Sequence, residues 1–85
     1  MITNRYDGIV LGSSALQTSV ANAEIIPTNQ TIINFKLMND QLCTISINGA
    51  TAVYVRASQG IEIPVVTSCK IVENGITFNW IGISG

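Results

Sequence analysis

Short stretches in which apolar and polar residues alternate recur along most of this 85-residue chain. Alternation with a period of two residues is typical of a β-strand that buries one face. In "TIINFKL", residues 31–37, the side chains of Ile33, Phe35 and Leu37 share one face, and we expect that face to point into a core. No stretch has the 3.6-residue period of an amphipathic helix. The pattern therefore predicts an all-β protein.

Polar turn clusters separate six or seven such stretches. The Asn48-Gly49 pair favours the positive φ angles of a tight hairpin, and residues 73–75, "ENG", are a second hairpin signal. Pro64 indicates an edge strand or the end of a strand. The expected strands cover residues 20–26, 31–37, 42–47, 51–57, 61–65, 67–72 and 75–84. Short, evenly spaced strands predict a small antiparallel β-sandwich or jelly-roll-like barrel.

The first 19 residues differ from the rest of the chain. They contain Gly8, Gly12 and a Ser/Thr-rich second half, with no sustained period of either kind. We interpret residues 1–19 as an extended arm and residues 20–85 as a single β domain. Ile9, Val10 and Leu11 form a short apolar segment within the arm. A segment this apolar is expected to lie against its own domain or against a neighbouring molecule.

The last expected strand is apolar on both faces. Phe78 and Trp80 alternate with polar residues, but Ile81 and Ile83 then point to the opposite face. Two interpretations remain open. A bulge at Gly82 could turn these side chains inward, or both faces of the strand could be covered by protein. The second interpretation requires more protein than one small domain supplies, so it places Ile81 and Ile83 in an interface.

The composition agrees with association. Hydrophobic residues make up 47% of the chain and charged residues 11%, against roughly 25% charged residues in average soluble proteins. The net charge is −1 and the basic residues are scattered, so no nucleic-acid partner is expected. The apolar runs are far shorter than the roughly 20 residues that cross a bilayer, so no membrane partner is expected either. A homo-oligomer, or a subunit docked on a larger lattice, is the simplest account.

Catalytic chemistry has few candidate residues. The chain has no histidine, which removes the common catalytic triads and histidine metal sites. Asp40, Glu62 and Glu73 lie in turns or on outward strand positions, so we interpret them as solvated charges. We therefore expect no enzyme activity, no cofactor and no metal. Cys43 and Cys69 share the parity of apolar neighbours, which favours two reduced core thiols over a disulfide.

Three residues could contribute to binding. Tyr54 and Arg56 share the outward face of the expected strand at 51–57, and aromatic residues and arginine are enriched at interface hot spots. An exposed surface patch in which the Arg56 stem covers the ring is an equal alternative. Trp80 shares its parity with Phe78, which favours a place in the core.

One part of the chain resembles a known class of proteins. The segment "ISINGATAVYVRASQGIEIPVVTSCKIVENGITFNWIG", residues 45–82, is similar to short β modules of virion structural proteins of tailed bacteriophages. In these modules a strand-NG-strand hairpin precedes a glycine-containing turn and a closing strand that ends in Trp-Ile-Gly. The resemblance implies a non-enzymatic component of the phage particle, such as a capsid decoration, head-fibre attachment or tail protein, commonly trimeric. It implies no catalytic residues.

Two functional hypotheses follow. The first is a virion subunit that binds its own copies, with a trimer favoured, and larger virion proteins. Its expected interface residues are Ile9, Val10, Leu11, Tyr54, Arg56, Ile81 and Ile83. The second is an extracellular carbohydrate- or receptor-binding β-sandwich in which Tyr54 and an exposed Trp80 stack on a surface glycan. An inhibitor or adaptor from a mobile element is also compatible with the composition.

Overall fold

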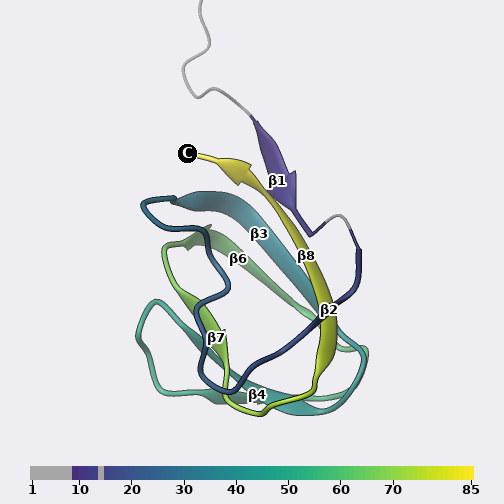
Figure 1. Ribbon diagram of the computed structural model, residues 1–85. Coiled ribbons are helices and arrows are strands. Elements are labelled where there is room, and N and C mark those ends of the chain that lie inside the picture. Colours follow the sequence, from purple (N-terminus) through teal and green to yellow (C-terminus); the bar gives the residue numbers. More distant parts are fainter. Residues whose placement is uncertain (1–8, 14) are drawn as a thin grey trace, which may run out of the picture.

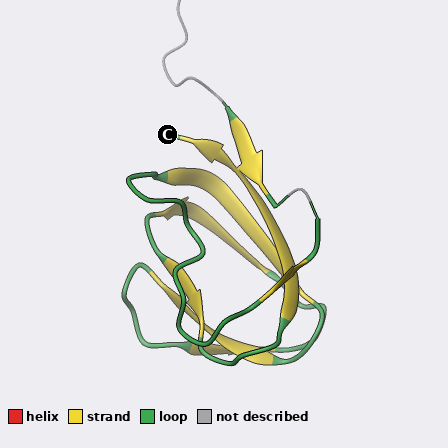
Figure 2. Cartoon of the chain, viewed as in Figure 1, coloured by secondary structure: helices red, strands yellow, loops and turns green. Residues whose placement is uncertain are grey.

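The strands of this protein form two antiparallel layers in a computed structural model, which describes residues 9–13 and 15–85 (Figure 1). These residues form eight strands and no helix. Figure 2 marks the strands in yellow. The strands are β1 (Val10–Gly12), β2 (Gln17–Thr18), β3 (Ile32–Asn39), β4 (Cys43–Ile47), β5 (Val53–Val55), β6 (Ile61–Val66), β7 (Cys69–Ile71) and β8 (Thr77–Ser84). The predicted all-β sandwich class is confirmed.

One layer is a five-stranded sheet and the other a three-stranded sheet. The order in the larger sheet is β1-β8-β3-β6, with β2 also paired to β8, and the order in the smaller sheet is β5-β4-β7. Their inner faces enclose one core, in which the rings of Phe35 and Trp80 lie 5.7 Å apart. Trp80 is buried, as its parity predicted. The buried apolar residues are Ile26, Ile32, Phe35, Leu37, Cys43, Ile45, Val55, Val66, Cys69, Ile71, Ile76, Phe78 and Trp80.

Six of the expected strands contain an observed strand, but the first does not. Residues 20–26 form a turn in which the Ala23 N–H donates to the Val20 carbonyl, and Asn22 has a φ of 58°. Only Glu24 forms a bridge, to Lys70 of β7. Val20 is 64% exposed. The alternation of apolar and polar residues at 20–26 wrongly predicted a strand, because the chain turns here before it can pair with another strand.

The two hairpin signals have different outcomes. Asn48 and Gly49 both have positive φ and connect the paired strands β4 and β5, which confirms the first. The second is wrong, because β7 pairs with β4 whereas β8 belongs to the other sheet. Residues 73–75 are therefore a crossing between the layers.

The described part of the predicted arm belongs to the larger sheet. β1 pairs with the end of β8 and β2 with its beginning. Ser19 fixes the end of the arm, since its hydroxyl donates to the Glu73 carbonyl (2.7 Å) and accepts from the Ile76 N–H (2.9 Å). The arm thus lies against its own domain over these residues. The predicted positions 1–8 and 14 lie outside the described residues.

The two cysteines are free and buried, as expected. β7 pairs with β4 so that Cys69 is opposite Ile47, four positions from Cys43. At about 3.3 Å per residue this places Cys43 about 13 Å along the strand, about twice the Cα separation that a disulfide spans. The disulfide alternative is therefore excluded within one chain. Burial raises the pKa of the Cys69 thiol to about 12, so this thiol is uncharged at neutral pH.

Candidate interaction surface

The last strand, β8, alternates without interruption. Phe78, Trp80 and Gly82 point inward, so Ile81 and Ile83 stay on the outer face of the five-stranded sheet. A Cβ atom on Gly82 would collide with the side chain of Ile32, which explains the glycine at this position. Of the two interpretations left open by the sequence, the bulge at Gly82 is therefore wrong, because the irregularity lies in the neighbouring strand.

A β-bulge in β3 changes the face on which its residues lie. The pairing with β8 shifts between Ile33 and Lys36, and Asn34 has a φ of 54°. Asparagine tolerates this left-handed conformation better than most residues. The bulge places Phe35 and Leu37 in the core but Ile33 on the outer face. The sequence prediction that all three share one face is therefore wrong for Ile33.

The bulge aligns four aliphatic side chains in one line across the outer face, near the ends of β3, β6 and β8. Val10 of β1 is opposite Ile83 of β8, Ile83 is opposite Ile33 of β3, and Ile33 is opposite Val65 of β6. Residues directly opposite each other in antiparallel strands lie on the same face. We call these four residues the apolar row. Its two ends, Val10 and Val65, are 63% and 48% exposed.

A second line of residues runs beside the apolar row. Ile81, which is 50% exposed, lies opposite Lys36, and Lys36 lies opposite Glu62. The Lys36 Nζ and a Glu62 carboxylate oxygen are 3.0 Å apart. Because both side chains are largely exposed, this ion pair contributes little to stability. The Glu62 carboxylate also partly neutralises the positive charge of Lys36.

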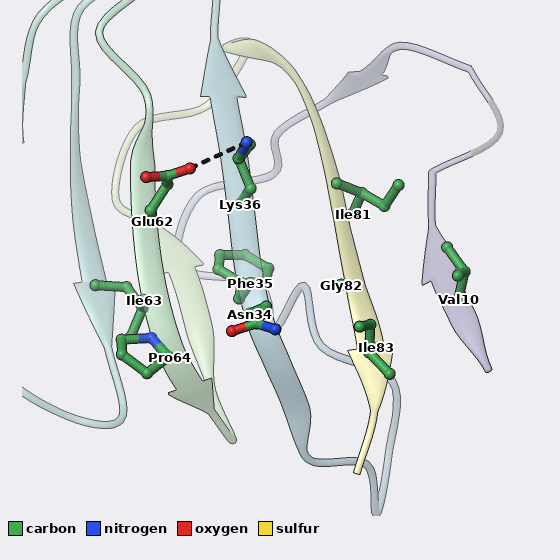
Figure 3. A pocket seen from close by; sticks show the side chains of 10 residues that line it. All are labelled: Val10, Asn34, Phe35, Lys36, Glu62, Ile63, Pro64, Ile81, Gly82 and Ile83. Atoms are coloured by element: carbon green, nitrogen blue, oxygen red, sulfur yellow. Dashed lines mark ion pairs between the residues drawn. The ribbon is translucent and has the colours of Figure 1, made fainter. Parts of the chain in front are cut away.

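A shallow hollow of about 650 Å³ lies between these two lines of residues. Figure 3 shows Val10, Ile81 and Ile83 on one side of β3, and Ile63 and Pro64 on the other. The ion pair closes one end. Most of the lining residues are apolar, so the hollow favours an apolar partner over a charged ligand.

The outer face of the other sheet is polar. Since Cys43 and Ile45 point inward, Thr44 and Ser46 of β4 point outward. Tyr54 lies opposite Thr44 and Lys70 lies opposite Ser46. The molecule therefore presents an aliphatic face on one layer and a polar face on the other.

The β6 edge of the larger sheet is poorly suited to an added strand. Among the described residues, β6 pairs only with β3, and Pro64 in β6 has no N–H to donate. The Asn48 side chain donates to the Val65 carbonyl (3.1 Å) and accepts from the Thr67 and Ser68 N–H groups (2.7 and 3.2 Å). These features occupy the edge groups that another strand would need. Addition of a strand at β6 is therefore disfavoured.

The structure divides the predicted interface residues into two groups. Ile9, Val10, Ile81 and Ile83 lie together at β1 and β8. Leu11 packs against the core of its own domain, so it does not belong to the free surface.

Tyr54 and Arg56 are exposed, but they belong to β5 and the residue after it, in the other sheet. Ile33 and Val65 are absent from the predicted interface, because the bulge that brings them outward is not visible in the alternation. Trp80 is only 8% exposed, which contradicts the stacking platform formed by Tyr54 and an exposed Trp80.

Two carboxylates are structural groups. The Thr44 N–H and hydroxyl donate to Glu73 (2.9 and 2.7 Å), and these bonds lower the pKa of Glu73. The prediction that Glu73 is merely solvated is wrong. Partial burial opposes ionisation of Glu24, but hydrogen bonds from Ser68, Cys69 and Ile26 and the nearby Lys70 charge outweigh it and lower the Glu24 pKa. Both groups fasten loops to the three-stranded sheet.

Other classes of site are not visible in the part of the chain that the structure describes. Residues 9–13 and 15–85 contain no cluster of three metal-ligating side chains. They also contain no helix that could span a membrane. Comparison of the chain with protein families, curated proteins and solved structures finds no match.

Proposed function

We propose that this protein is a non-enzymatic structural subunit of a phage particle that associates with its own copies and with larger virion proteins. The apolar row on the outer face of the five-stranded sheet carries the proposal. An uncovered line of aliphatic side chains across a whole sheet is typical of an interaction surface. The resemblance of residues 45–82 to phage virion modules supports the choice of particle.

The self-association is tested by light scattering of the purified protein over a range of concentrations. The wild-type mass should exceed the 9.1 kDa of one chain. Val10→Asp should weaken association by about tenfold or more, because it places a charge in the apolar row. Val20→Asp is the matched control, since Val20 is 64% exposed in the turn at residues 20–26, and its mass should equal that of the wild type.

Circular dichroism should show unchanged β structure in both variants. A wild-type protein that remains a monomer at every concentration would contradict the self-association. The particle itself is tested by mass spectrometry of purified virions, in which the chain should be found at many copies per particle. A chain confined to infected-cell extract would contradict the virion role.

A further inference from the structure

We propose that Asn74 is a site of spontaneous deamidation, and that the isoaspartate product releases the end of the arm from the crossing at residues 73–75. The chain contains two Asn-Gly pairs, Asn48-Gly49 and Asn74-Gly75. Asparagine before glycine is especially prone to this reaction, because glycine has no Cβ to shield its backbone nitrogen. The reaction consumes only water, so this inference does not depend on the proposed function.

The reaction is an intramolecular attack on a side-chain amide. The Gly75 nitrogen loses its proton and bonds to the Cγ atom of Asn74, and ammonia leaves, which gives a cyclic succinimide. Water then opens the ring at either carbonyl group. One product is aspartate, and the other is isoaspartate, in which the main chain runs through Cβ. The attacking nitrogen and Cγ must meet in one specific geometry, so restraint of the side chain slows ring closure.

The two Asn-Gly pairs have similar surroundings. All four residues are exposed. Both glycines have a positive φ, 78° at Gly49 and 85° at Gly75. Among the described residues, no atom outside the adjoining residues lies within 4 Å of the position that a Cβ would take on either glycine. Exposure and local backbone conformation therefore do not explain a difference in reactivity between the pairs.

Hydrogen bonds hold the Asn48 side chain in place. Its amide nitrogen donates to the Val65 carbonyl (3.1 Å). Its oxygen accepts from the Thr67 N–H (2.7 Å), the Thr67 hydroxyl (3.1 Å) and the Ser68 N–H (3.2 Å). Rotation of this amide toward the Gly49 nitrogen breaks all four bonds. The first Asn-Gly pair is therefore protected by the fold.

The Asn74 side chain lacks this restraint. It is exposed and makes no hydrogen bond to another described residue. Only the attacking group is held here, because the Gly75 N–H donates to the Ser19 carbonyl (2.9 Å). Ring closure therefore breaks one hydrogen bond at Asn74 but four at Asn48. Asn74 should react first in the folded protein.

Ser19 joins the arm to both sides of Asn74. Its hydroxyl donates to the Glu73 carbonyl (2.7 Å) and accepts from the Ile76 N–H (2.9 Å). Its N–H donates to the Ile76 carbonyl (2.8 Å), and its carbonyl accepts from Gly75. Isoaspartate at position 74 inserts one carbon, about 1.5 Å of extra main chain, between these partners. The partners then no longer align with Ser19, so the end of the arm is released.

Tryptic mapping of the full chain after incubation at mildly alkaline pH tests the site. Cleavage after Lys36, Arg56 and Lys70 places Asn48 and Asn74 in separate peptides. Mass spectrometry should show deamidation of folded Asn74 at least about tenfold faster than that of Asn48, because fewer hydrogen bonds break. In urea the two rates should be similar. A folded Asn48 that reacts as fast as Asn74 would overturn the proposal, as would a folded Asn74 that stays intact.

The release of the arm is measured by hydrogen exchange on the isoaspartate form, separated by ion-exchange chromatography. The Ser19 and Ile76 N–H groups should exchange at least about tenfold faster in this form than in the unmodified protein, because the bonds that protect them are lost. Unchanged exchange would show that the arm stays attached. Asn74→Gln is the control, since its longer side chain closes the ring poorly. This variant should keep its β structure by circular dichroism and stay unmodified at position 74.

Discussion

Asn39 shows how one buried polar residue organises the end of the sandwich. Its side chain is fully buried and donates to the carbonyls of Gln41 (2.8 Å) and Arg56 (2.9 Å). Its oxygen accepts from the Gly60 N–H (3.0 Å). One amide therefore joins the end of β3 to the connections before β4 and β6. Such a group is stabilising only because all its hydrogen bonds are made.

Asn39→Ala should lower the free energy of unfolding by about 3 kcal/mol, because it leaves a buried N–H and two carbonyls without partners. Urea denaturation measures this change. The control is Asn79→Ala, an exposed asparagine on β8, which should change stability by less than about 0.5 kcal/mol. Equal effects in the two variants would contradict the role of Asn39.

At the scale of elements, the bulge in β3 decides which residues form the outer face. Asn34 adopts a left-handed backbone conformation, and its side chain is exposed. It therefore stabilises the bulge through its backbone conformation and not through side-chain packing. The bulge turns Ile33 outward while Phe35 remains in the core. Without it, the apolar row would lose Ile33, one of its two central members.

Asn34→Val should destabilise the protein by about 1 to 2 kcal/mol, since a β-branched residue resists positive φ. Asn34→Gly should be within about 0.5 kcal/mol of the wild type, because glycine adopts this conformation readily. Thermal unfolding measures the stability of both variants and of the wild type. Asn79→Val, in regular strand geometry, should be neutral or slightly stabilising. A harmless Asn34→Val would show that the bulge is not required.

Sequence patterns predicted the strands better than their pairing. The alternation located β4, β6 and β8 and placed Trp80 in the core, since these depend on local parity. The sequence predicted the turn at residues 73–75. It could not predict that this turn joins two different sheets, because turn residues determine only the local backbone angles. Ile81 and Ile83 were predicted to lie on the opposite face from Trp80, and they do. Ile33 and Val65 could not be predicted, because a bulge inverts parity without a distinctive residue pattern.

At the scale of the whole molecule, two carboxylates hold loops onto the three-stranded sheet. Glu24 accepts from groups at the start of β7, and Glu73 from Thr44 of β4. The pKa of each is lowered from an ordinary value of 4.5. A lowered folded-state pKa means that the unfolded chain binds protons first as the pH falls. Their contribution is thus complete above about pH 4.5 and is lost as the pH falls through the folded pKa.

Unfolding stability should therefore be nearly constant around neutral pH and decline below about pH 4.5. The double variant Glu24→Gln, Glu73→Gln should be less stable at pH 7 and should lose less stability on acidification. Urea denaturation at pH 7 and pH 3 measures both effects. Glu62→Gln, which removes only an exposed ion pair, should follow the wild type. A double variant with the full acid sensitivity of the wild type would contradict this role.

The central position of β8 also constrains how the chain is made. β8 is the last strand in the sequence, yet β1, β2 and β3 all pair with it. Ser13 and Trp80, which are joined by hydrogen bonds, are 67 residues apart. During synthesis, the larger sheet cannot close until residues 77–84 leave the ribosome. Pairing between distant strands is also slow. A nascent chain with so few charges therefore exposes its apolar strands to mispairing until translation of β8 ends.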